Sequence, residues 1–295
     1  MGKILRLADV TLTNLLAPKI FERDLIESDG SLFLFDANHQ FGQFTGVPDS
    51  GAAVPNVLSN KAALLLGGNA SSQNFTVAVK NPDSAIWKTE RTLRGGVHGI
   101  ITQAGSQAVS LGMNITPANS IRDHILENMT THRFYFSLWS VVTRKGIDNI
   151  ADQSPFHFAQ TTSNFLFHME NGLPSPNSAL TREGFKQEPT LGDSLTSTAA
   201  PYSRFASIGV IAPTNAGPAS TSSFGLRLGT ADAWAWYNYN KAPSRIIYRA
   251  YAEDMTVSGR TYAEVEAIDY ALYQAAFGPG GKFADDTYTN PSTIP

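Results

Sequence analysis

The sequence predicts an all-β fold, an antiparallel two-sheet sandwich with one short C-terminal helix. Roughly ten short runs of apolar or alternating residues are spread over about 200 residues, and Gly, Pro, Asn or Asp bounds each run, as is typical of strands. Helical stripes do not alternate with these runs, which disfavours a parallel α/β fold. The 24 Gly and 16 Pro supply the turns that many short strands need.

The strongest strand candidate is residues 133–143. Its apolar residues divide between two faces, with Phe134, Phe136, Leu138 and Val142 on one and Tyr135, Trp139 and Val141 on the other. A strand that is apolar on both faces lies centrally in a sheet that is covered on both sides or meets a partner at an interface. We therefore expect this strand at the centre of the fold.

Shorter strands are expected before and after this segment. They cover residues 31–35, 75–79, 96–102, 108–114, 156–158, 164–168, 204–211, 223–228, 233–239 and 244–251. From 171 to about 198 the chain is polar and Pro-rich, with hardly any apolar periodicity. That stretch is predicted to be a long excursion from the sheets.

One helix start is clearly marked, at Thr261-Tyr-Ala-Glu264. The Thr261 hydroxyl can accept the amide of residue 264, while the Glu264 carboxylate reaches back to the amide of residue 261. Apolar residues follow with a period of about 3.6 until Gly278, so we expect the short C-terminal helix here.

These elements divide the chain into three parts. Residues 1–65 hold a lone strand and many loop formers, and we expect an N-terminal arm or docking segment there. Residues 66–275 carry the β-sandwich domain. Residues 276–295 are expected to form a Pro/Gly-rich C-terminal tail.

Low charge is the most restrictive feature of the composition. Charged residues make up 16% of the chain, against roughly a quarter in ordinary domains, and the net charge is −3. The absence of a basic stripe argues against nucleic acid as a partner, and the apolar runs are too short for a membrane span. The chain has no cysteine, which excludes disulfides and thiol catalysis. Because so few charges keep the chain in solution, we expect partners to cover part of its surface.

Two groups of segments carry a resemblance to known proteins. Residues 248–265, with Val257-Ser258-Gly259 before the capped helix, resemble the last strand and closing helix of concanavalin-like or laminin-G-like sandwiches. Residues 94–103, the strand around Trp139 and residues 288–295 are similar to structural proteins of tailed bacteriophages. The resemblance implies a jelly-roll or concanavalin-like sandwich and a place in the virion, assembled in the host cytoplasm.

The aromatic segment 234–240 is the most notable candidate binding surface. Aromatic rings on a strand can form a platform for sugars, and two nearby arginines can bracket an acidic sugar. The residues concerned are Trp234, Trp236, Tyr237, Tyr239, Arg245 and Arg249. Packing in the core or between subunits explains the same cluster, so contact with a glycan and contact with a subunit stay open as alternatives.

No catalytic residue, metal site or cofactor is predicted. Glu264, Glu266 and Asp269 come closest to a glycosidase carboxylate set, but on a helix Glu264 and Glu266 diverge by about 200°. We interpret these acids as a solvated helix face with a capping Glu. The six histidines lack the spacing of a zinc-binding helix; His157 and His168 can meet across a hairpin, where ordinary hydrogen-bonded histidines are the simpler interpretation.

The sequence therefore favours a non-enzymatic virion structural protein, as a component of a tail, baseplate or fibre. Its expected partners are other virion proteins, further copies of itself with a trimer favoured, and host-surface glycans. Two alternatives stay open. One is a capsid decoration or head-completion protein with the same fold, and the other is a polysaccharide-cleaving enzyme.

Overall fold

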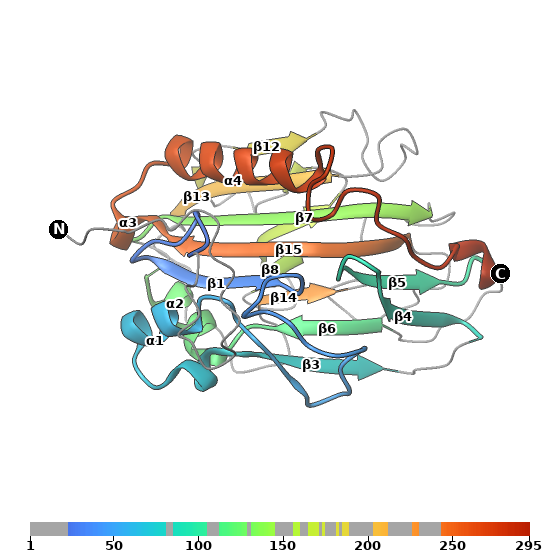
Figure 1. Ribbon diagram of the computed structural model, residues 1–295. Helices are drawn as coiled ribbons and strands as arrows, with labels where there is room; N and C mark the ends of the chain where they lie inside the picture. The colour runs from blue at the N-terminus through green and yellow to red at the C-terminus, as the bar shows by residue number, and fades with distance from the viewer. Residues whose placement is uncertain are drawn as a thin grey trace, which may run out of the picture.

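Antiparallel β-sheets make up most of the computed structural model of this chain (Figure 1). The structure describes residues 23–80, 85–104, 112–128, 131–144, 156–159, 165–170, 173–174, 181–182, 185–188, 203–211, 226–229 and 243–295. In these residues strands predominate and helices are few, so the all-β prediction is confirmed.

The first sheet is built around two long strands, β7 (Phe134–Arg144) and β15 (Ser244–Asp254). Its other described strands are β1 (Ser31–Asp36), β4 (Trp87–Arg91), β5 (Val97–Ile101), β11 (Thr181–Arg182), β12 (Phe185–Glu188) and β13 (Ser203–Ile211). They follow the order β11-β13-β7-β15-β5-β4, with β1 also paired to β15 and β12 to β13. The two long strands thus lie in the middle of this sheet.

The second sheet has the order β10-β9-β8-β14-β6-β3-β2. Its strands are β2 (Ala53–Val54), β3 (Phe75–Lys80), β6 (Gly112–Thr116), β8 (Phe156–Ala159), β9 (Phe165–Glu170), β10 (Leu173–Pro174) and β14 (Leu226–Gly229). His157 and His168 are register partners in the β8–β9 pair, as the hairpin argument predicted for their backbones.

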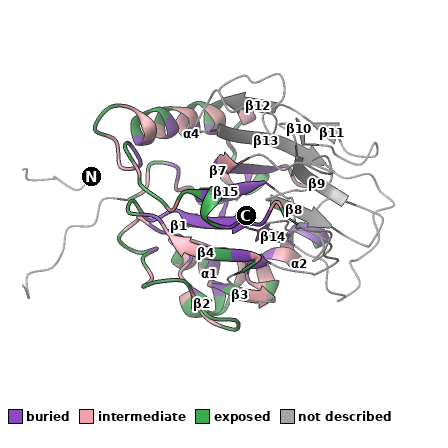
Figure 2. Ribbon diagram, turned by 90° about the vertical axis from the view of Figure 1, so that its right-hand side faces the viewer, coloured by how far each residue is buried: buried purple, intermediate pink, exposed green. Residues whose placement is uncertain are grey.

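The core lies between the two sheets. Phe134, Phe136 and Leu138 of β7 share one buried cluster with Phe75 of β3 and Ile115 of β6. The opposite face of β7 contributes Tyr135, Trp139 and Val141 to two further buried clusters, in which they meet side chains of the C-terminal helix. The predicted division of β7 into two apolar faces is confirmed, and the chain itself covers both faces (Figure 2).

Several helices accompany the sheets. They are α1 (Ser59–Leu66), α2 (Asn119–Asn128), α3 (Met255–Ser258), α4 (Tyr262–Phe277) and the 3₁₀ helices η1 (Ala70–Gln73) and η3 (Pro291–Thr293). The predicted capping box at Thr261 is present and begins α4, but α4 has 16 residues, and α1 and α2 were not predicted. Leu58 precedes α1 and makes no side-chain cap hydrogen bond, so this helix lacks the usual starting residue.

The domain boundaries differ from those expected. β1 is buried along its whole length and pairs with β15, with Asp36 opposite Arg249, so residues 31–36 belong to the sheet and not to a separate arm. Sheet pairing satisfies the backbone groups of such a strand, which an isolated arm would leave to water. Residues 1–22 lie outside the described residues.

The C-terminal segment also packs against the sheet. Phe283 is fully buried with its ring centroid 4.7 Å from that of Tyr248, and the carbonyl of Pro295 accepts the amide of Gln103 at 2.8 Å. The expected Pro/Gly-rich tail is therefore an ordered cover for the sheet rather than a free end.

Two predicted regions are described in part or not at all. The stretch from 171 to 198, expected to be an excursion, contains the short strands β10, β11 and β12 among its described residues. The expected strand at 233–239 lies outside the described residues. Among the described helices, none combines the length and the apolar character that crossing a bilayer requires.

We predict that Thr261→Ala lowers the free energy of unfolding by about 1 kcal/mol. The Thr261 hydroxyl accepts the Glu264 amide at 3.3 Å, and alanine leaves that amide without its cap. Urea unfolding of both variants measures the effect, with Thr261→Ser as the matched control because it keeps the hydroxyl. An equal loss in both variants would show that the cap does not account for it.

Candidate functional site

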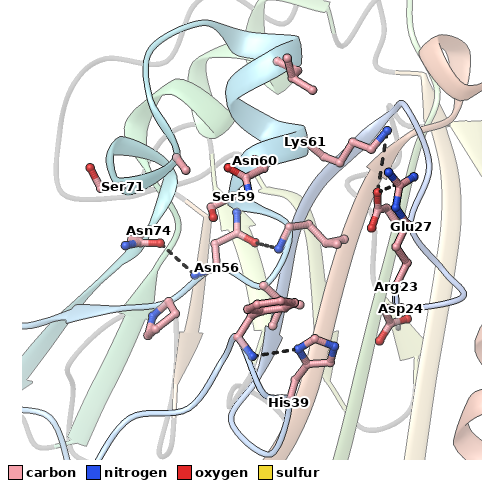
Figure 3. Close-up of a pocket in the computed structure, with 16 residues that line it drawn as sticks. Arg23, Asp24, Glu27, His39, Asn56, Ser59, Asn60, Lys61, Ser71 and Asn74 are labelled. Atoms are coloured by element: carbon pink, nitrogen blue, oxygen red, sulfur yellow. Dashed lines mark hydrogen bonds and ion pairs between the residues drawn. The ribbon is translucent and has the colours of Figure 1, made fainter. Parts of the chain in front are cut away.

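A pocket of about 640 Å³ opens beside α1 (Figure 3). The start of the described chain, the loop after β1, the loop before α1 and the turn at η1 surround it. Its lining residues are Arg23, Asp24, Glu27, His39, Phe41, Pro55, Asn56, Val57, Leu58, Ser59, Asn60, Lys61, Leu64, Ala70, Ser71 and Asn74.

Asn56 holds the walls of this pocket together. Its side-chain oxygen accepts the amides of Leu34 in β1 and Leu58 before α1, both at 3.0 Å. Its side-chain nitrogen donates to the carbonyls of Leu32 and Gln73, at 3.2 and 3.1 Å. Because one buried amide connects β1, α1 and η1, the pocket is a built feature of the fold.

The rim of the pocket is polar and weakly charged. Lys61 donates to the exposed Asp29 carboxylate at 2.8 Å, and this hydrogen bond lowers the pKa of Asp29. Lys61 and Arg23 also lie 3.8 and 3.7 Å from Glu27. The Arg23 side chain is 80% exposed, and an ion pair with so exposed a partner contributes little to stability, so Arg23 can turn toward a ligand at small cost.

An aromatic ring stands at the pocket mouth. Phe41 is 44% exposed, and its ring centroid lies 5.6 Å from that of His39. The hydroxyls and amides of Ser59, Asn60 and Ser71 line the same pocket. An apolar ring beside neutral donors and acceptors suits a ligand with both apolar and hydroxyl-bearing faces, as a sugar has.

A buried ion network adjoins the pocket through Asp24, which lines the pocket. Arg249 of β15 is 1% exposed, and its two terminal nitrogens donate to the two carboxylate oxygens of Asp24 at 2.8 and 2.9 Å. Asp36 of β1 accepts from the same guanidinium at 3.0 Å and also from Lys282. The network thus pairs two acidic with two basic side chains inside the protein. The Arg249 guanidinium also lies 4.8 Å above the centroid of the Trp139 ring.

The pKa values of three members of the network are shifted. Burial alone would raise the pKa of Asp24, but the charge and hydrogen bonds of Arg249 outweigh burial and lower that pKa to about 2. Burial would likewise lower the pKa of Arg249, yet the charges of Asp24 and Asp36 raise it. Lys282 has a lowered pKa because burial is the dominant influence on it. Asp24 therefore stays ionised in the pocket wall near neutral pH.

The structure brings together only part of the sequence-predicted surface. Trp234, Trp236, Tyr237 and Tyr239 lie outside the described residues. Arg245 and Arg249 are each 1% exposed, so neither guanidinium faces solvent; Arg249 instead anchors the wall of the pocket. The residues around Phe41 were not predicted, because no periodic pattern marks this loop.

The acids of α4 separate into different roles. Glu264 closes the capping box, whereas Asp269 is fully buried and does not lie on a solvated face as expected. Asp269 accepts hydrogen bonds from Tyr135, Ser137 and Trp139 on the outer face of β7, at 3.0, 3.3 and 3.2 Å. Its carboxylate therefore fastens α4 to the sheet.

Comparisons of the chain with protein-family models, curated proteins and solved structures found no match.

We predict that the Asp24–Arg249 pair makes the fold acid-sensitive. The folded-state pKa of Asp24, about 2, lies below the usual 3.8, so its contribution of about 2 kcal/mol is complete above pH 4 and is lost as the pH falls toward 2. Asp24→Asn removes this contribution and leaves a flatter dependence of unfolding free energy on pH between 4 and 2.

Urea unfolding at a series of pH values measures that slope. Asp49→Asn is the matched control, since Asp49 is exposed and lies outside the buried network. If Asp24→Asn kept the wild-type slope, the acid sensitivity would have another source.

Proposed function

We propose that this chain is a non-enzymatic structural protein of a tailed-bacteriophage virion, working as a tail, baseplate or fibre component. In this proposal its sheets form a jelly-roll or concanavalin-like sandwich that assembles with other virion proteins and with further copies of itself, as a trimer. Host-surface glycans are its proposed ligands. The resemblance of residues 94–103 to structural proteins of tailed bacteriophages supports the class, and the resemblance of residues 248–265 to concanavalin-like sandwiches supports the fold.

The placement of charge is the observation that carries the proposal. Charged residues are already scarce, and six of those described are buried: Asp36, Arg245, Arg249, Glu253, Asp254 and Asp269. Buried charges are rare in ordinary domains, and here they leave the outer surface poorer in charge than the composition suggests. A surface with little charge is suited to permanent cover by neighbours in an assembly.

Exposed apolar side chains indicate which face neighbours would cover. Leu64 of α1 is 82% exposed and Leu25 is 73% exposed, and both belong to segments that line the pocket beside α1. Exposed large apolar side chains are typical of interaction sites. The surface around α1 is therefore the proposed contact region.

Asp24 is unsuited to donate a proton in glycan cleavage at the pocket. A glycosidase needs a carboxylic acid with a raised pKa as proton donor, whereas Asp24 has a lowered pKa and is held by Arg249. The polysaccharide-cleaving alternative would have to use other carboxylates. Cryo-microscopy of the assembled particle separates the remaining alternatives, since density on the capsid would identify a decoration or head-completion protein.

We predict that the full-length chain self-associates. Sedimentation velocity should give a species of three times the chain's 31.8 kDa, and replacement of Leu64 by Ser should shift the equilibrium toward the monomer. Leu93→Ser is the control, because Leu93 is similarly exposed but does not line this pocket. A wild-type chain that stays monomeric at all concentrations would contradict the assembly proposal.

We predict that Phe41→Ala weakens glycan binding roughly tenfold, because the sugar loses its apolar platform. The measurement is binding of the chain to a glycan array, followed by titration of the strongest glycan. Tyr288→Ala is the matched control, since Tyr288 is a similarly exposed aromatic residue, at 42%, outside the pocket. Equal affinity in wild type and Phe41→Ala would remove this pocket as the glycan site.

A further inference from the structure

Two histidines and an aspartate meet at the junction of α2, β7 and β15. His124 belongs to α2, His132 lies two residues before the start of β7, and Asp254 ends β15. One potential ligand atom of each lies within 4.8 Å of the other two. His124 Nε2 and His132 Nδ1 lie 2.9 and 2.6 Å from the same oxygen, Asp254 Oδ2.

The carboxylate of Asp254 is held in position before any ligand binds. Its side chain is fully buried, and Oδ1 accepts the amides of Thr256 and Val257 at 3.0 and 3.1 Å. Since Oδ1 is engaged in capping α3, Oδ2 is left to face the two histidines.

The histidines are also fixed by their surroundings. The amide of His132 donates to the carbonyl of Asn128 at 2.7 Å, which ties this loop to the end of α2. The centroid of the Phe134 ring lies 6.2 Å from that of His124 and 6.3 Å from that of His132, so one apolar ring packs against both imidazoles. The two histidine side chains keep 15% and 25% of their surface exposed, so an ion can reach them from solvent.

We propose that His124, His132 and Asp254 bind one divalent transition-metal ion of the zinc type, with water as the fourth ligand. Two imidazoles and one carboxylate are a ligand set that zinc accepts, at about 2 Å from each atom. Tetrahedral ligands at that distance lie about 3.3 Å apart, so small side-chain shifts from the observed contacts admit the ion. The ion would link the end of β15 to two elements more than 100 residues earlier in the sequence, and the inference does not depend on the proposed virion role.

Asn128 lies beside the second ring nitrogen of His124. Its side-chain nitrogen donates to the His124 carbonyl at 2.8 Å and lies 3.3 Å from His124 Nδ1. An imidazole that binds an ion through Nε2 carries its proton on Nδ1, and that N–H needs a hydrogen-bond acceptor, which the Asn128 nitrogen is not.

Isothermal titration of the untagged full-length chain with Zn²⁺ tests the proposal. We expect one ion per chain, binding at least tenfold weaker in His132→Gln and Asp254→Asn, and no comparable binding of Mg²⁺. Asparagine still caps α3, so Asp254→Asn removes the charged ligand while keeping the local fold. Co²⁺ bound in place of Zn²⁺ should give the visible absorption of a tetrahedral site, which the same variants lose.

Three further variants make the test specific. Asn128→Asp supplies an acceptor for the Nδ1 proton and should tighten Zn²⁺ binding about tenfold, an effect that a purely structural hydrogen-bond cluster would not produce. His39→Gln and the double variant His157→Gln/His168→Gln should bind as the wild type does. The proposal is overturned if the wild type takes up no Zn²⁺, or if binding survives in folded His132→Gln and disappears in the double variant.

Discussion

Arg249 lies in the middle of β15 with its guanidinium out of contact with water, and a positive charge at that depth is tolerated only where anions meet it. Asp36 comes from the neighbouring strand β1, and Asp24 comes from the chain before β1. Lys282, after α4, balances the second carboxylate. Three segments must therefore reach the same point of the sheet. Two of them precede Arg249 by more than 200 residues, and the third follows α4.

A buried ion network of this kind favours one packing of the strands over others more than it increases the free energy of unfolding. Replacing a buried ion pair by apolar residues is often neutral, whereas removing one partner is costly, because the other charge is left without compensation. In this chain any packing that displaced β1 from β15 would leave the buried charge of Arg249 without its partner Asp36. Since Asp24 is both a partner of Arg249 and part of the pocket wall, the same constraint that fixes β1 also fixes the pocket beside α1.

Local patterns could be predicted from the sequence, and contacts between distant segments could not. The alternation of the apolar side chains of β7 between two faces and the capping box of α4 each depend on residues close together in the sequence, and both are present in the structure. α1 begins without a capping side chain, so its start carries no such pattern. The partner of β1 and the cluster of His124, His132 and Asp254 depend on pairing across 122 or more residues, which spacing along the chain does not reveal.

The structure also changes the argument for assembly. A strand that is apolar on both faces was expected to be covered on both sides or to meet a partner, and α4 together with Phe283 supplies the outer cover within the chain. The case for partners then rests on the scarcity of surface charge and on the exposed apolar side chains near α1. The proposed glycan pocket lies on that same surface. A subunit that covers this surface would therefore compete with a glycan for the pocket, unless the pocket stays open at the edge of the subunit contact. Self-association and glycan binding are therefore coupled in this proposal, and each is best measured in the presence of the other.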